Sequence, residues 1–150
     1  MKLAEALQER AALIKRINGL SDRLEDNLFV EENTEPSESP AKLLEELNSC
    51  SEQLEELVVR INLTNAALKI GLETMTSLLA RRDVMRKKLS ILQNMLNNAR
   101  SHNHRYYRSE TRMVRTIDVP EMQKRLDRLY RDMRELDATI QQANWSNDLI

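Results

Sequence analysis

Residues 118–145 read DVPEMQKRLDRLYRDMRELDATIQQANW, and this stretch decides the fold. Its apolar side chains recur every three and four positions, which places them on one narrow stripe of a helix. Such a stripe is stable only when other helices cover it. The stripe consists of Met122, Leu126, Leu129, Met133, Leu136, Ile140 and Ala143.

The same spacing occurs upstream and predicts further long helices. One stripe runs through Leu43, Leu47, Cys50, Leu54, Leu57, Ile61, Thr64 and Leu68. Only two Gly and three Pro occur in 150 residues, which leaves few residues that would interrupt a helix. The sequence therefore predicts an all-α fold, an elongated antiparallel four-helix bundle or coiled coil that forms a single domain over residues 1–150. The helices are expected at about 2–28, 40–70, 75–103 and 119–145.

Residues at the expected helix ends support these boundaries. Ser39 followed by Pro40 predicts the cap and first turn of the second helix, and Gly71 predicts its end. Asp118 precedes Glu at the capping-box spacing and predicts the start of the fourth helix. Gly19 lies inside the first helix and is expected to weaken it by about 1 kcal/mol relative to alanine.

The segment between the third and fourth helices, residues 104–118, breaks the helical period. Its second part is rich in Thr, Val, Ile and Tyr, which favour extended backbone. We predict an extended connector or a short β-hairpin there.

Charge is divided between two parts of the chain. Residues 22–56 hold 12 acidic and 2 basic side chains, whereas residues 81–115 hold 10 basic and 2 acidic ones. The net charge of −1 conceals this division.

The connector carries arginine and tyrosine side chains that are candidates for an interaction site. Arginine pairs with phosphate and tyrosine stacks on bases, so one hypothesis is a nucleic-acid- or phosphate-binding strip. The favoured hypothesis is neutralisation by the acidic loop that contains Glu31, Glu32, Glu35 and Glu38, within the chain or between subunits. The candidate residues are Arg105, Tyr106, Tyr107, Arg108, Arg112 and Arg115.

Polar residues also lie at or beside the apolar stripes, near the turn between the second and third helices. A polar residue in a stripe lowers stability but fixes the register of helix pairing, and this is the favoured interpretation. A small-molecule pocket is the alternative. The residues are Asn62, Thr64, Asn65, Arg82 and Asp83.

Other functional classes have no sequence signal. We expect no catalytic residues, no cofactor and no metal site, because no nucleophile–base pair, phosphate-binding glycine loop or metal-ligand spacing occurs. The amino-terminal sequence is amphipathic and charged, unlike a secretory signal, and no segment has the length of apolar sequence needed to span a bilayer. The single cysteine allows no internal disulfide, and we expect a cytoplasmic protein.

Several sequence blocks resemble an uncharacterised bacterial family often labelled septicolysin. The resemblance covers nearly the whole chain, and it implies no catalytic or binding residues. The label implies a pore-forming, membrane-active protein. The blocks are the opening MKLAEAL, Arg60–Ala66, Leu79–Met85, Tyr107–Glu110, Val114–Val119, Arg134–Asp137, Ile140-Gln141 and Ala143–Trp145.

Three functional hypotheses follow from the sequence. The first is a structural or interaction protein that associates with itself, since opposite charge blocks suit complementary subunit contacts. The second is nucleic-acid binding by the connector, and the third is septicolysin-like membrane activity. An enzyme is not expected.

Overall fold

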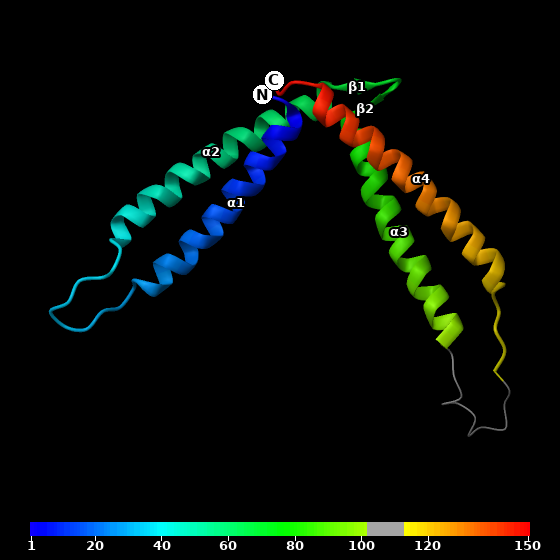
Figure 1. The fold of residues 1–150 in the computed structure, drawn as a ribbon, viewed down its shortest axis with the longest axis horizontal. Coiled ribbons are helices and arrows are strands. Elements are labelled where there is room, and N and C mark those ends of the chain that lie inside the picture. The colour runs from blue at the N-terminus through cyan, green and yellow to red at the C-terminus, as the bar shows by residue number, and fades with distance from the viewer. Residues whose placement is uncertain (102–112) are drawn as a thin grey trace. The chain divides into compact units, whose positions relative to one another are not determined.

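The residues that the structure describes form four long helices and one small β-hairpin (Figure 1). A computed structural model describes residues 1–101 and 113–150. The element order is α1 (Leu3–Asp26), α2 (Pro40–Ala67), β1 (Lys69–Ile70), β2 (Glu73–Thr74), α3 (Met75–Ser101) and α4 (Val119–Ser146). The predicted all-α fold class with four helices is confirmed. The helices start within one residue of the predicted positions, and the predicted end of the third helix at 103 lies outside the described residues.

The chain divides into two compact units. Unit 1 comprises Met1–Thr74 and Gln141–Ile150, and unit 2 comprises Met75–Ile140. The expectation that all residues form a single four-helix domain stays a prediction.

In unit 1, α1 and α2 run antiparallel (Figure 1). They bury matching rows of side chains spaced seven residues apart. A seven-residue spacing keeps one row facing the partner helix along its whole length. Each row ends in a buried polar residue: Asn27, which directly follows α1, and Thr64 in α2. The α1 row is Ala6, Leu13, Leu20 and Asn27; the α2 row is Leu43, Cys50, Leu57 and Thr64.

In unit 2, α3 and α4 also pair through apolar rows. Leu89 and Leu96 of α3 form a buried cluster with Leu126 and Met133 of α4. Half-buried apolar residues pack around this cluster, as the stripe predicts. The part of the α4 stripe from Met122 to Met133 therefore packs against α3.

The hairpin lies between α2 and α3, a position that the sequence analysis did not predict. Lys69 pairs with Thr74 and Ile70 with Glu73, so Gly71 and Leu72 form a two-residue turn. Gly71 has φ of 64°, and a positive φ at the first turn position is the arrangement of a type II′ turn. Gly71 was expected to end the second helix, but that helix already ends at Ala67.

The predicted hairpin between the third and fourth helices is not found in the part of that connector that the structure describes. Residues 113–118 contain no strand. Residues 104–112 lie outside the described residues. Ser39 occupies the N-cap position of α2 and Pro40 its first turn, but the Ser39 side chain makes no capping hydrogen bond. The Asp118 carboxylate caps α4 by accepting a hydrogen bond from the Glu121 N–H over 3.1 Å.

Candidate interaction site

The last residues of the chain pack against its first residues and against α2, within unit 1. The Leu3 N–H donates to the Asn147 carbonyl, and the Leu149 N–H donates to the Met1 carbonyl, each over 2.9 Å. These two hydrogen bonds flank the bridge between Lys2 and Asp148. Backbone hydrogen bonds therefore join the first three residues of the chain to residues 147–149.

Thr64 connects this paired segment to α2. Its side chain is only 3% exposed, its hydroxyl donates to the Arg60 carbonyl over 2.8 Å, and it accepts a hydrogen bond from the Ile150 N–H over 3.0 Å. The Arg60 Nε in turn donates to the Ile150 carbonyl over 2.8 Å. A buried hydroxyl without partners would be costly, so these bonds fix how the segment lies on the helix.

An ion pair adds to the same contact. Lys2 Nζ lies 3.0 Å from the Asp148 carboxylate. The hydrogen bond from Lys2 and then its positive charge lower the pKa of Asp148 below its ordinary value of 3.8. The pair is exposed to solvent, so its effect on stability is screened by salt.

The remaining residues predicted to set register are less buried than Thr64. Asn62 is exposed and Asn65 is half-buried on α2. Arg82 and Asp83 belong to unit 2 and pair with each other, with Arg82 Nε and Nη2 each 3.2 Å from Asp83 Oδ1. The register role assigned to these four residues stays a prediction.

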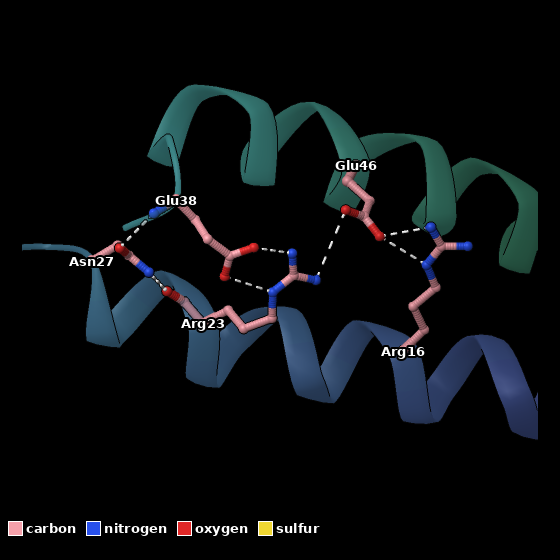
Figure 2. A network of polar contacts seen from close by, with 5 residues as sticks. All are labelled: Arg16, Arg23, Asn27, Glu38 and Glu46. Carbon is pink, nitrogen blue, oxygen red and sulfur yellow. Dashed lines mark hydrogen bonds and ion pairs between the residues drawn. The ribbon is translucent and has the colours of Figure 1, made fainter. Parts of the chain in front are cut away.

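The opposite end of the α1–α2 pair carries a second polar network (Figure 2). Arg23 of α1 makes two hydrogen bonds to the Glu38 carboxylate, one of them 2.9 Å from Arg23 Nε. Glu46 lies 3.9 Å from Arg23 and receives a 2.8 Å hydrogen bond from Arg16 Nε. Pairing with Arg23 lowers the pKa of Glu38 below its ordinary 4.5, and the same hydrogen bond raises the pKa of Arg23.

Asn27 joins this network to the backbone. Its side-chain nitrogen donates to the Arg23 carbonyl over 2.8 Å, and its side-chain oxygen accepts a hydrogen bond from the Glu38 N–H over 3.0 Å. Both ends of the loop between α1 and α2 are therefore held together. Sequence reasoning missed Asn27, although it continues the seven-residue spacing of Ala6, Leu13 and Leu20.

The arginine-rich connector lies mostly outside the described residues, which is the case for Arg105, Tyr106, Tyr107, Arg108 and Arg112. Arg115 is exposed in the irregular segment before α4. Among the loop acids expected to neutralise the connector, Glu38 pairs instead with Arg23 of its own helix pair. Neutralisation of the connector by the other acids stays a prediction.

The two units carry opposite charge. Unit 1 holds 16 acidic and 8 basic side chains, a net charge of −8, whereas unit 2 holds 15 basic and 8 acidic ones, a net charge of +7. The charge division seen along the sequence therefore coincides with the structural division of the chain.

Over residues 1–101 and 113–150, no group of three or more His, Cys, Asp or Glu side chains is placed to hold a metal ion. None of the four helices, within the described residues, has the length and apolar character that a bilayer crossing requires.

The chain belongs to a family of unknown function, DUF6847, which matches residues 10–149. It is also similar to a functionally unknown conserved protein from Corynebacterium diphtheriae, known from a crystal structure. The two are 34% identical with a TM-score of 0.93, and the match covers 100% of this chain and 99% of the other. No curated protein matches the chain.

Proposed function

We propose that this member of a family of unknown function is an interaction protein whose copies associate with one another through units of opposite charge. The observation that carries the proposal is the net charge of −8 on unit 1 and +7 on unit 2. Opposite charges on separate surfaces steer two copies so that unit 1 of one approaches unit 2 of the other.

Partly covered stripes support the same proposal. In unit 1, the residues that flank the buried row remain half-buried, because a single partner helix covers a stripe from one side only. A further copy would bury more of this apolar surface, which favours association. The half-buried residues are Ile17, Leu24, Leu47 and Leu54.

The solution mass of the full chain tests the proposal. Light scattering after size exclusion, at about 0.05 M and about 0.5 M NaCl, should give an oligomer at low salt that loosens at high salt, since salt screens exposed charges. A monomer at both salt concentrations, over a wide range of protein concentration, would overturn the proposal.

A pair of variants tests the role of charge. Lys87 and Lys88 are exposed on α3. The double substitution Lys87→Glu and Lys88→Glu makes unit 2 less positive and should reduce the mass at low salt. Lys87→Arg with Lys88→Arg is the matched control: it preserves charge and should leave the mass unchanged.

Nucleic-acid binding is the second candidate, and the net charge of +7 on unit 2 favours it. Such binding would weaken steeply as salt rises, because phosphate contacts release counterions. Titration of a labelled single strand and a labelled duplex at several salt concentrations tests it. Septicolysin-like membrane activity is a third candidate, and leakage of a dye from liposomes tests it.

We propose no enzymatic role and no cofactor. The sequence contains no nucleophile–base pair or phosphate-binding glycine loop that would support one.

A further inference from the structure

The loop between α1 and α2 exposes three consecutive apolar residues. Leu28, Phe29 and Val30 are 60%, 90% and 49% exposed, and Phe29 is the only phenylalanine of the chain. Exposed aromatic side chains are costly in water and are enriched at the centres of protein interfaces. These three residues are called the apolar tip below.

The apolar tip is held in place at its base. Asn27, directly before it, is buried and accepts a hydrogen bond from the N–H of Glu38 at the other end of the loop. The Arg23–Glu38 pair closes the same base. Because the ends of the loop are fixed, ordering the tip against a partner costs less conformational entropy.

Acidic residues surround the apolar tip. Residues 22–38 contain seven Asp and Glu and one Arg, a net charge of −6. The single Arg is already paired with Glu38. A partner surface for the tip should therefore be apolar at its centre and basic at its edge.

Unit 2 carries a groove that combines apolar lining residues with a basic one. It lies between α3 and α4, has a volume of about 420 Å³, and is lined by the buried Leu89 and Met133. Arg86, Ser90 and Tyr130 also line it. Arg86 lies 3.8 Å from Asp137, a long contact between exposed side chains that a closer carboxylate would replace.

The charge of α3 matches the tip. This helix holds six basic residues and one acidic residue, a net charge of +5. The groove is open to solvent and has room for one large side chain.

We propose that the apolar tip of one copy binds in the α3–α4 groove of a second copy, with Phe29 against Leu89 and Met133 and with the loop acids near Arg86. This inference rests on the proposed self-association and names the surfaces that would form it. The tip and the groove are different surfaces, so the contact is heterologous and each copy offers one of each. Association would then continue into rings or open chains.

Two variants test the tip and the groove independently. Phe29→Ser removes the aromatic group from the tip, and Ser90→Glu places a negative charge at the groove, where Ser90 is exposed. Each should weaken self-association by about tenfold or more, as loss of a central interface contact does. Neither residue belongs to a buried row, and circular dichroism with thermal unfolding verifies that both variants fold.

Each of these two substitutions has a matched control variant. Leu72→Ser removes another fully exposed apolar side chain, at the hairpin turn. Asn98→Glu adds the same charge to an exposed position of α3 that does not line the groove. Both control variants should associate like the unchanged protein.

Mixing the two variants provides the sharpest test. A Phe29→Ser copy retains its groove and a Ser90→Glu copy retains its tip, so the mixture contains one functional pair of surfaces. At a protein concentration at which each variant alone is monomeric, the mixture should form a heterodimer and nothing larger.

Three outcomes overturn the inference. Association of both variants as strongly as the unchanged protein would locate the contact elsewhere and leave the proposed self-association standing. A mixture that remains monomeric would show that tip and groove do not bind each other. An unchanged protein that is monomeric at every concentration and salt would remove the proposed function together with this inference.

Discussion

The Thr64 hydroxyl accepts a hydrogen bond from the Ile150 N–H over 3.0 Å, across 86 residues of sequence. Thr64 continues the buried row of α2, and the same hydroxyl donates to the Arg60 carbonyl one helical turn earlier. A residue predicted to fix helix register therefore fixes the position of the last residues of the chain on α2.

Replacing Thr64 by Val preserves its shape and removes the hydroxyl. The Ile150 N–H then loses its hydrogen-bond partner, and unfolding in urea should show a loss of about 0.5–1.5 kcal/mol. Thr64→Ser retains the hydroxyl and should lose less.

Thr139→Val is the matched control for this change. The Thr139 hydroxyl also donates to the carbonyl four residues earlier, over 3.0 Å, but Thr139 is exposed. Its replacement should change stability by less than about 0.5 kcal/mol. Equal losses at both positions would contradict the role assigned to Thr64.

The two glycines should respond to alanine in opposite directions. At neither position would an added Cβ meet an atom within 4 Å, so the backbone alone decides the result. Gly71→Ala should cost about 1–2 kcal/mol because φ is 64°. Gly19→Ala should stabilise the protein by about 0.5–1 kcal/mol, since Gly19 lies inside α1. Thermal unfolding measures both, and a stabilising Gly71→Ala would mean that the turn has a different backbone.

Leu126→Ala should destabilise the protein strongly. Leu126 is fully buried in the α3–α4 cluster, and truncation of a buried Leu costs about 2–5 kcal/mol. Ile91→Ala, on the exposed surface of α3, is the control and should cost little. Similar losses for the two variants in denaturant titrations would contradict the observed pairing of α3 with α4.

The free energy of unfolding should fall in acid as the Glu38 carboxylate becomes protonated. The folded-state pKa of Glu38 lies below its ordinary 4.5, so its pair with Arg23 contributes fully above that value. The contribution is lost as pH falls from about 4.5 through the lowered pKa. Asp148 behaves in the same way below 3.8, through Lys2.

A double-mutant cycle on Arg23→Gln and Glu38→Gln, measured by urea unfolding between pH 7 and pH 3, tests this interpretation. Each single variant should be less stable than the unchanged protein at pH 7, and the difference should shrink in acid. The double variant should lose less than the sum of the two, because the paired residues act together. Additive losses at every pH would show that the pair is not coupled.

The sequence determined the helices because apolar spacing and helix-end residues act locally. The stripe through Leu126 and Met133 predicts α4, and Asp118 and Pro40 mark helix starts within one residue. The charge division is also a property of the sequence. Thr64 was recognised as polar within a stripe, since its position in the row follows from counting residues.

Only the tertiary structure decided which distant groups meet. The partners of Thr64 and Arg23 are Ile150 and Glu38, and no local pattern specifies either contact, because each depends on how two segments are placed in space. Gly71 shows the same limit. A glycine favours positive φ equally at a helix end and in a hairpin turn, so its sequence position did not distinguish the two. Pairing of Lys69 with Thr74 and of Ile70 with Glu73 places Gly71 in the turn, since the backbone groups of these residues find partners across the hairpin.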